Sequence, residues 1–252
     1  MNKDTIAGII PARYGSTRFP GKPLADLKGK PMIQRVYEQA SKALSEVYVA
    51  TDDERIAAAV RQFGGKVVMT SPDHQSGTDR CAEALDLIEA ETKKTFDVVI
   101  NIQGDEPFIE PELLETLACC FHSSMTEIAT LVKPLKTPDD LWDPNKPKVV
   151  INSDYQALCF SRSPIPYLRH YPKEEWHLHH KYYLHIGLYA YRSDILREIT
   201  NLQPSLLETA ESLEQLRWLE NQYTISVRTT RHESIGIDTP ADLERVLQAG
   251  LL

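Results

Sequence analysis

The feature that most constrains the fold is the alternation, in the first half of the chain, of short apolar runs with amphipathic helical patterns. The apolar runs lie at residues 6–12, 47–51, 66–69 and 98–102. Between them, segments 32–44, 54–63 and 78–91 repeat their apolar residues about every 3.6 positions. This rhythm is typical of an α/β protein whose central, mostly parallel sheet has helices on both faces.

From residue 129 the pattern changes to short β runs at 129–133, 148–151, 157–161 and 186–191. The stretch 163–183, rich in Pro, His and Tyr, is expected to be a mobile loop or a cover over a site. A helix at 206–221, a strand at 224–229 and a helix opened by Thr239 and Pro240 complete the pattern. We expect one domain over 1–252, with a core formed by 1–128 and 222–252 and a smaller β-rich part formed by 129–221.

Composition excludes several classes of protein. The net charge of -8 argues against non-specific nucleic-acid binding, because the molecule as a whole repels polyanions. No apolar run reaches the roughly 18 residues of a membrane-spanning helix, and the chain leads straight into a strand instead of a signal peptide. We therefore expect a cytoplasmic protein with no stable membrane association. The four cysteines lack paired metal-binding spacing, so free buried thiols are expected.

The loop after the first apolar run carries the clearest chemical signal. It places Arg13, Arg18 and Lys22 in one turn-rich segment, where Gly15 and Gly21 let backbone amides approach a ligand closely. Three cations beside accessible amides suit a triphosphate. The loop is not a P-loop, because five residues separate the glycines and a proline follows the lysine. On the charges alone, a solvated surface loop is the alternative.

Two acidic positions follow apolar runs in opposite halves of the chain. Asp105 lies in the loop after residues 98–102, and Asp238 follows Ile235-Gly236-Ile237. Ligands of a parallel sheet collect beyond the carboxyl ends of its strands, so Asp105 should face the basic loop. Carboxylate oxygens suit Mg²⁺, which shares its coordination with waters and substrate phosphates. Asp105 is the first predicted metal ligand, and Asp238 is a candidate for the same ion or a second. Alternatively, Asp238 is only a turn or helix-capping acid.

Two other interpretations are disfavoured. His177, His179 and His180 invite a zinc site, but they lack a companion cysteine or an HExxH pattern. A dinucleotide-dependent oxidoreductase would need a GxGxxG motif after the first strand, and the sequence has none there.

Several ordered motifs together resemble the 3-deoxy-manno-octulosonate cytidylyltransferases, or CMP-Kdo synthetases. The longer motifs are residues 11–24, 73–80, 103–107 and 238–240, with shorter ones at 160–162, 185–189 and 213–217. The resemblance runs nearly end to end. It implies a Rossmann-like nucleotidyltransferase fold, CTP and Kdo (3-deoxy-D-manno-octulosonate) as substrates, Mg²⁺ dependence and usually a homodimer. It also implies that the core binds the nucleotide, and that part 129–221 binds the sugar and mediates dimerisation.

The resemblance implies roles for individual residues. The positions that match the family's nucleotide site are Ala12, Arg13, Ser16 and Lys22, with Gln75 and Ser76 reading the cytosine. Arg13 and Lys22 would neutralise the triphosphate. Asp105 and Asp238 match the family's magnesium-binding acids, in agreement with the interpretation from the residues themselves. The positions that match the sugar-acid site are Gln103, Arg162, His185, Tyr189, Glu214 and Gln215. A guanidinium such as Arg162 can pair two parallel hydrogen bonds with a carboxylate.

Without the resemblance, these positions have plainer interpretations. Residues 75 and 76 would be loop and helix-cap residues. Residues 185 and 189, in an apolar run at even spacing, would be structural. Residues 214 and 215 would lie on the exposed face of a helix. One departure is that residues 167–169 read Tyr-Leu-Arg where family members often carry Trp-Asp-Arg, so Arg169 is a further candidate sugar-binding arginine.

The sequence therefore predicts cytidylyl transfer from CTP to Kdo, with pyrophosphate as the second product. A CMP-sialic acid synthetase or a sugar-1-phosphate nucleotidyltransferase is the alternative within enzymes. A non-catalytic nucleotide-binding sensor is the alternative from another class.

Overall fold

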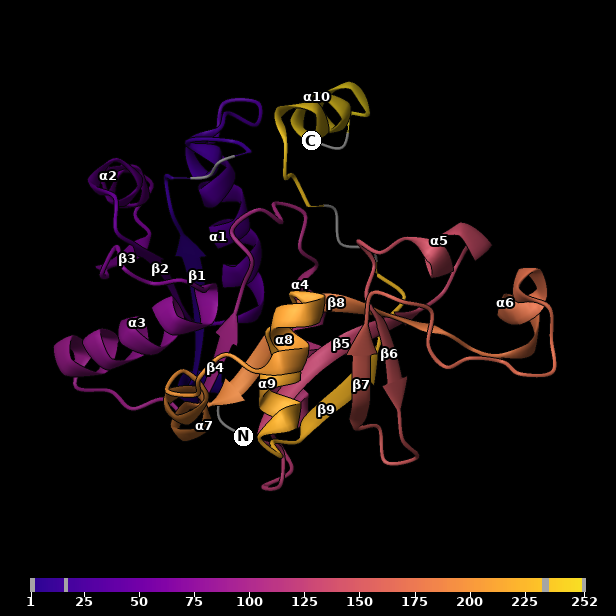
Figure 1. Ribbon diagram of the computed structural model, residues 1–252. Helices are drawn as coiled ribbons and strands as arrows, with labels where there is room; N and C mark the ends of the chain where they lie inside the picture. The colour runs from indigo at the N-terminus through magenta and orange to yellow at the C-terminus, as the bar shows by residue number, and fades with distance from the viewer. Residues whose placement is uncertain (1–2, 16–17, 233–235, 251–252) are drawn as a thin grey trace.

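Nine strands, within the residues that the structure describes, join into one sheet (Figure 1). The computed structural model describes residues 3–15, 18–232 and 236–250. The strands are β1 (Ile6–Ala12), β2 (Glu46–Thr51), β3 (Lys66–Met69), β4 (Val98–Asn101), β5 (Ile128–Pro134), β6 (Lys148–Ile151), β7 (Ala157–Ser161), β8 (Tyr183–Arg192) and β9 (Ile225–Thr229). The order across the sheet is β3-β2-β1-β4-β8-β5-β9, and β6 and β7 form a hairpin that attaches to β8.

Along the main strand order, four of the six neighbouring pairs run parallel, which confirms the predicted, mostly parallel sheet. β3, β2, β1 and β4 pair in parallel, as do β5 and β9. β8 runs antiparallel to both β4 and β5. The β runs predicted after residue 129 therefore continue the sheet begun in the first half. All four strands predicted in the first half are present, with bounds within one residue.

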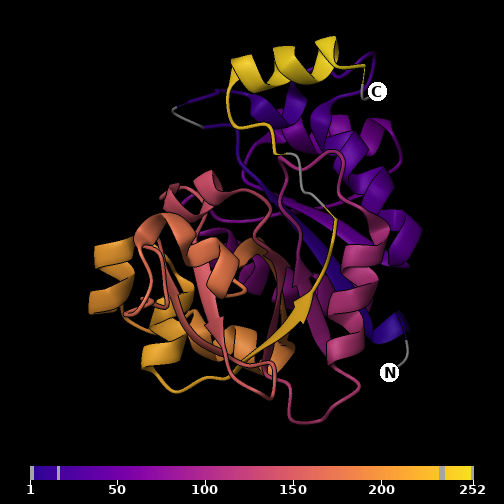
Figure 2. The same ribbon diagram turned by 90° about the vertical axis from the view of Figure 1, so that its right-hand side faces the viewer.

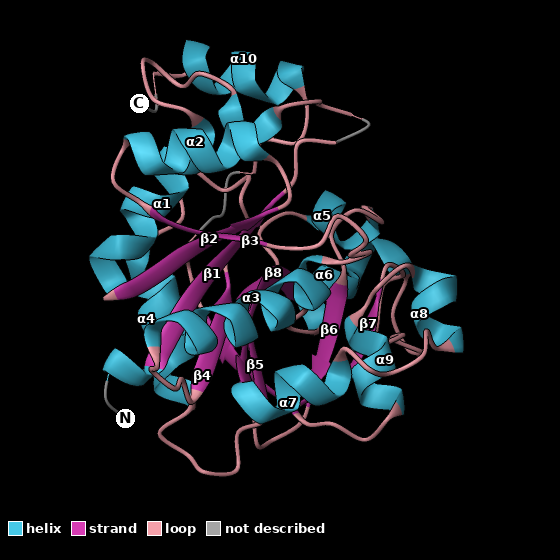
Figure 3. Cartoon of the chain, turned by 90° about the vertical axis from the view of Figure 1, so that its left-hand side faces the viewer, coloured by secondary structure: helices cyan, strands magenta, loops and turns pink. Residues whose placement is uncertain are grey.

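Helices cover both faces of the sheet, as predicted, and Figure 3 shows α3 lying across the near face. One face packs against α1 (Met32–Ala43), α2 (Glu54–Gln62) and α4 (Pro111–Cys120), the other against α3 (Gly77–Thr92), α7 (Ser193–Ile199) and α9 (Gln215–Glu220). β1 is buried on both sides, since Ile10 belongs to the first core and Ile9 to the second. In the described ranges, every helix is too short or too polar to cross a bilayer.

The helices that follow β4 differ from the prediction. α4 and α7 were not predicted. The predicted helix at 206–221 is two helices, α8 (Leu206–Glu211) and α9, because Ser212 adopts a left-handed backbone with φ of 51°. The break lets Arg217 on α9 pair with Glu208 on α8 and with Glu214 in the connection. The thiols differ as well: all four cysteines are free, but Cys119 and Cys159 are exposed.

The segment 163–183 was predicted as a mobile loop or a cover over a site, and it is partly helical. It contains a 3-10 turn (Lys173–Glu175) and α6 (Trp176–His179), and β8 begins at residue 183, three residues before the predicted strand. Trp176 and Tyr182 are buried against Leu141 of α5 (Pro138–Trp142). The segment therefore has a small apolar core of its own, well away from α3 in Figure 1.

The end of the chain returns to the first third of the sequence. Helix α10 (Pro240–Gln248) begins where predicted, with Thr239 as N-cap and Pro240 in its first turn. Val246 of α10 and Ile237 before it pack with Leu27 and Met32. In Figure 2 this helix lies over the N-terminal helices. Residues 237–238 are thereby brought to the edge of the sheet where β1 and β4 end.

Candidate active site

A cavity of about 270 Å³ opens at the carboxyl ends of β1, β3 and β4, where ligands of α/β sheets bind. Its described lining residues are Pro11, Ala12, Arg13, Arg18, Lys22, Pro23, His74, Gln75, Ser76, Gly77, Arg80, Gln103, Gly104, Asp105 and Asp238. The basic loop, the loop before α3 and the Asp105 loop therefore share one edge, as expected from the strand pattern.

The basic loop closes on itself through the backbone. The Gly21 N–H donates to the Tyr14 carbonyl at 3.0 Å. Gly21 has a φ of 70°, and a Cβ there would lie 3.1 Å from the Tyr14 ring, so only glycine fits without strain. The closed loop directs Arg13, Arg18 and Lys22 toward the cavity. The loop therefore lines the cavity, although Arg13 and Arg18 are themselves exposed to solvent.

The two predicted metal-binding acids lie close together around one lysine. Lys22 Nζ is 2.6 Å from Asp105 Oδ2 and 3.2 Å from Asp238 Oδ1. The C-terminal segment is fixed here because the N–H of buried Ile237 donates to the Asp105 carbonyl at 2.9 Å. The side chain of Thr239, not that of Asp238, caps α10. The Asp238 carboxylate is thereby left to face Lys22, and its interpretation as a helix cap is wrong.

The remaining nucleotide-site predictions fall around the start of α3 and the end of β1. Buried Ala12 and exposed Gln75 both line the cavity. Ser76 lines it too, and it is also the N-cap of α3, where it exchanges hydrogen bonds with Asp79 at 3.1 and 3.2 Å. Ser76 therefore both caps α3 and lines the cavity. Ser16 lies outside the described residues.

Two ionisable residues of the cavity lining, Arg80 and His74, were not singled out from the sequence. Arg80 is buried, donates to Thr70 Oγ1 at 2.5 Å and pairs with Asp52 at 3.2 Å. His74 pairs with Glu83 at 2.5 Å. Burial tends to raise the pKa of Glu83, but the hydrogen bond from His74 lowers it below its usual range. The sequence did contain a signal for them, because His74 and Arg80 both belong to the motif 73–80, which also contains Gln75.

Gln103, His185 and Tyr189 meet at β8. Gln103 lines the cavity, and its Nε2 donates to the Gly187 carbonyl at 3.1 Å. The rings of His185 and Tyr189 lie on either side of Gly187 along the strand, with centroids 5.2 Å apart. Three of the residues assigned to the sugar acid are thus connected, with Gln103 nearest to the nucleotide loops.

Glu214 and Gln215 approach the same region from α9. Glu214 accepts a hydrogen bond from Thr78 Oγ1 at 2.8 Å and pairs with Arg217 at 3.0 Å. Burial raises the pKa of Glu214, and the bond from Thr78 opposes this shift. Gln215 is only 5% exposed. The interpretation of both residues as an exposed helix face is therefore wrong.

Arg162 lies outside the cavity lining and binds backbone carbonyls. Its Nε, Nη1 and Nη2 donate to the carbonyls of Glu211, Pro144 and Ser212 at 2.6, 2.9 and 3.2 Å. These bonds use three of its five N–H donors, so two are left for a carboxylate ligand. Arg169, the other candidate arginine, is exposed in the segment 163–183.

His185 is expected to make stability depend on pH. It bonds to Thr130 at 3.1 Å, and burial lowers its pKa to about 3. In the unfolded chain the pKa of histidine is about 6.5, so its contribution is complete above that pH and is lost as pH falls toward 3. Between pH 6.5 and 4, the free energy of unfolding should fall more steeply for wild type than for His185→Gln, by up to about 1.4 kcal/mol per pH unit. Urea denaturation at several pH values measures both slopes, and equal slopes would contradict the prediction.

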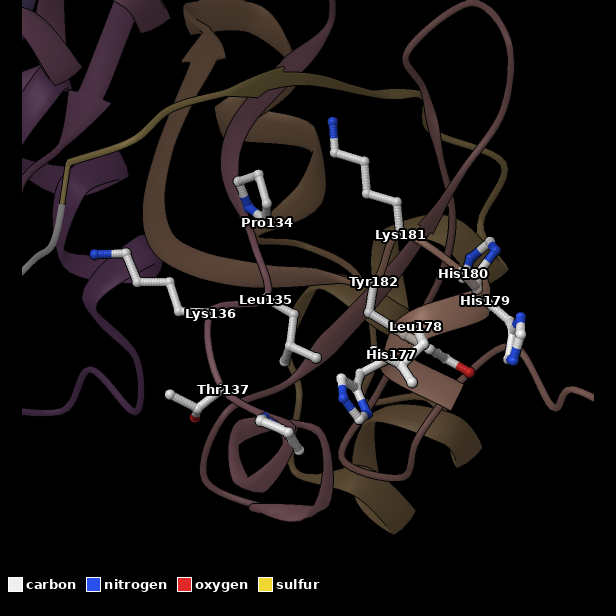
Figure 4. A pocket seen from close by; sticks show the side chains of 11 residues that line it. Pro134, Leu135, Lys136, Thr137, His177, Leu178, His179, His180, Lys181 and Tyr182 are labelled. Carbon is white, nitrogen blue, oxygen red and sulfur yellow. The ribbon is translucent and has the colours of Figure 1, made fainter. Parts of the chain in front are cut away.

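A second cavity, of about 400 Å³, lies between residues 134–138 and 177–182 (Figure 4). It contains the three histidines considered for zinc, His177, His179 and His180. Figure 4 shows their imidazoles pointing in different directions. Among the described residues, no group of three or more His, Cys, Asp or Glu side chains is placed to hold a metal ion.

Comparison with known proteins agrees with this geometry. A family model described as cytidylyltransferase matches residues 7–229. The chain is 60% identical over 244 residues to the 3-deoxy-manno-octulosonate cytidylyltransferase of Parabacteroides distasonis, covering 95% of this chain and 96% of the relative. It is 62% identical over 242 residues to the enzyme of the same name from Phocaeicola vulgatus, covering 94% of each.

Solved structures give the same result. A CMP:2-keto-3-deoxy-manno-octonic acid synthetase complexed with CTP superposes with a TM-score of 0.87 at 45% identity, over 98% of this chain and 99% of that one. A putative glucose-1-phosphate thymidylyltransferase from Bacillus anthracis shares the fold, with a TM-score of 0.61 at 20% identity over 97% and 94% of the two chains. The fold is thus the nucleotidyltransferase fold, and the chain belongs to the 3-deoxy-manno-octulosonate cytidylyltransferase family.

Proposed function

We propose that this enzyme transfers the cytidylyl group of CTP to Kdo, giving pyrophosphate and the CMP-Kdo used in lipopolysaccharide biosynthesis. The observation that carries the proposal is the convergence of Arg13, Arg18 and Lys22 with Asp105 and Asp238 on one cavity. Such cations neutralise a triphosphate, and paired carboxylates suit its divalent ion. The names of the relatives support Kdo as acceptor, and the similar structure with CTP supports the nucleotide.

The reaction forms a bond between the anomeric hydroxyl oxygen of Kdo and the α-phosphorus of CTP. The bond from that phosphorus to the leaving pyrophosphate breaks in line. No covalent bond to the protein is required, so the side chains act by positioning and by charge. Arg13 and Lys22 offset the charge that develops on pyrophosphate. Gln75 and Ser76 hold the cytosine, next to Ala12.

Asp105 and Asp238 are the residues that would hold Mg²⁺. The structure fits this role, because both carboxylates already converge on one cation, Lys22 Nζ, at 2.6 and 3.2 Å. Two carboxylates, completed by waters and phosphate oxygens, are a donor set that Mg²⁺ commonly uses. When bound, the ion would supply Lewis-acid chemistry, which would make the hydroxyl proton easier to lose.

The sugar acid is proposed to lie on the side of the cavity nearest β8 and α9. The supporting observations are the bond from Gln103 to β8, the contact of His185 with Tyr189, and the bond that ties Glu214 to α3. The buried Gln215 lies next to Glu214 in the chain. A polar wall behind the nucleotide site suits an acceptor with several hydroxyl groups.

Replacing Arg162 with alanine is expected to raise the KM for Kdo tenfold or more, because charged hydrogen bonds contribute about 1.5–3 kcal/mol. The KM for CTP should stay near the wild-type value. Arg192 offers a matched control, since it also donates to backbone carbonyls, those of Thr126 and Ser124 at 2.9 Å. Arg192→Ala should lower stability without changing either KM. An unchanged KM for Kdo in Arg162→Ala would exclude the sugar-acid role.

One assay separates the candidate functions. Pyrophosphate release is measured with CTP or UTP, and with Kdo or sialic acid, in the presence of Mg²⁺. Release only with CTP and Kdo supports the proposal, whereas release with sialic acid indicates a CMP-sialic acid synthetase. Release when a sugar 1-phosphate is supplied as the acceptor indicates a sugar-1-phosphate nucleotidyltransferase. No release with any acceptor, despite CTP binding, indicates a nucleotide sensor.

The part 129–221 is also proposed to mediate a homodimer. Support comes from large apolar side chains that are exposed there, among them Trp142, Tyr167 and Leu178. These residues lie in and around α5 and α6, at one end of the molecule in Figure 1. Light scattering measures the molar mass in solution, and a monomer would contradict the proposal. The cytoplasmic location stays a prediction, which cell fractionation tests.

A further inference from the structure

Lys22 occupies the place between the two carboxylates assigned to the metal. Its Nζ donates to Asp105 at 2.6 Å and to Asp238 at 3.2 Å, and its side chain is only 17% exposed. Arg18 adds a second positive charge, with Nη2 3.6 Å from the same Asp238 oxygen. Two neighbouring carboxylates repel each other, so the ammonium between them holds both in place.

The backbone of Lys22 is fixed by its neighbours, whereas its ammonium group can reach a second position, nearer to Arg13. The Gly21 bond to Tyr14 closes the loop just before Lys22, and buried Pro23 follows it. A lysine side chain is flexible and carries its charge on a four-carbon stem. Lys22 lines the same cavity as Arg13, so side-chain rotation alone could carry the ammonium from the acids toward bound phosphates.

We propose that Lys22 is an exchangeable cation, which holds Asp105 and Asp238 together in the ligand-free enzyme and releases them to the divalent ion when a triphosphate accepts its ammonium. The inference rests on the proposed function, because it takes the two aspartates as metal ligands. An ammonium and a divalent cation repel each other strongly at contact distance. Lys22 therefore weakens metal binding in the absence of nucleotide. By linkage, nucleotide and metal then bind with positive cooperativity.

The test measures metal binding to the full-length protein without nucleotide. Mn²⁺ is the probe, because its electron paramagnetic resonance signal distinguishes free from bound ion. Lys22→Gln should bind Mn²⁺ about tenfold more tightly than wild type, which lies within the usual range of coupling between sites. Lys30→Gln is the control, since Lys30 pairs with Glu38 at 2.7 Å and is not among the described lining residues. Its affinity for Mn²⁺ should equal that of wild type.

A second substitution separates this inference from the proposed function. Asp105→Asn is introduced into wild type and into Lys22→Gln. If Lys22→Gln binds Mn²⁺ more tightly than wild type, and this gain in affinity disappears when Asp105→Asn is added, the exchange is supported. Equal Mn²⁺ affinity in wild type and Lys22→Gln, with a loss in Asp105→Asn, overturns the exchange but keeps the metal site. Insensitivity of both backgrounds to Asp105→Asn overturns the metal site and the exchange with it.

A measurement on the wild-type enzyme does not depend on how the variants fold. Crystals grown with Mn²⁺ and CTP, without Kdo, should show Lys22 Nζ on phosphate oxygens and the metal on Asp105 and Asp238. If Lys22 still hydrogen-bonds to both carboxylates with the metal bound, the exchange is overturned.

Discussion

Replacing Asp105 with asparagine should lower kcat/KM on the order of a thousandfold while the protein remains folded. The amide keeps the shape of the side chain but removes the charge that faces Lys22 and, in the proposed function, Mg²⁺. Loss of such a contact removes several kcal/mol of transition-state stabilisation, and each 1.36 kcal/mol corresponds to about tenfold in rate. Pyrophosphate release in Mg²⁺, with CTP and Kdo varied, measures the effect.

The control for this variant is an aspartate on the exposed turn between β6 and β7. Asp154→Asn removes the same charge at a position outside the described cavity lining and should keep the wild-type rate. Thermal melting of both variants checks that they fold. A near-normal rate in Asp105→Asn would remove the metal-binding role from this residue.

Replacing Arg217 with methionine should destabilise the protein by about 3 kcal/mol. Arg217 is 8% exposed and pairs with Glu208 at 3.2 Å and with Glu214 at 3.0 Å. Removing one partner of a buried ion pair leaves uncompensated carboxylates, which typically costs about 3–5 kcal/mol. Burial already raises the pKa of Glu214, and loss of the guanidinium would raise it further. Glu214 would then take up a proton more readily in the folded variant than in the unfolded one. The loss in the free energy of unfolding, relative to wild type, should therefore shrink as pH falls from 8 toward 5.

A matched arginine on the surface tests whether burial is the cause. Arg197 also pairs with two acids, Asp86 and Glu89, both at 2.7 Å, but its side chain is 38% exposed. Arg197→Met should therefore cost no more than about 1 kcal/mol. Urea denaturation of both variants at pH 8 and pH 5.5 gives the free energies. Equal costs at the two positions would contradict the assignment of the effect to buried charge.

The parallel half of the fold is predictable because three of its four strands, β1, β2 and β4, are buried on both faces. β1 and β4 therefore read as continuous apolar runs between helical patterns. α4 was not predicted, although Pro111 in its first turn and Leu113, Leu114 and Leu117 at helical spacing are a readable signal. α7 spans only seven residues, which is too short for a clear period.

Other features depend on contacts that local patterns do not encode. The sequence around Ser212 favours a continuous helix, and the break there accompanies tertiary pairing by Arg217, which outweighs local propensity. The chemistry of Asp105 and Asp238 is readable from their motifs. Their proximity depends on a backbone bond from Ile237, which carries no side-chain signature. The burial of residues 214–215 follows in turn from how α9 packs on the sheet.

The late position of Asp238 has a consequence for how the enzyme is made. Ile237 and Val246 dock on Leu27 and Met32, which leave the ribosome long before them. A nascent chain can pair its first four strands while it lacks the second of the two acids. Under the proposed function, catalytic competence then arises only once residue 238 has been added, so nascent chains that stop short of it would not consume cellular CTP.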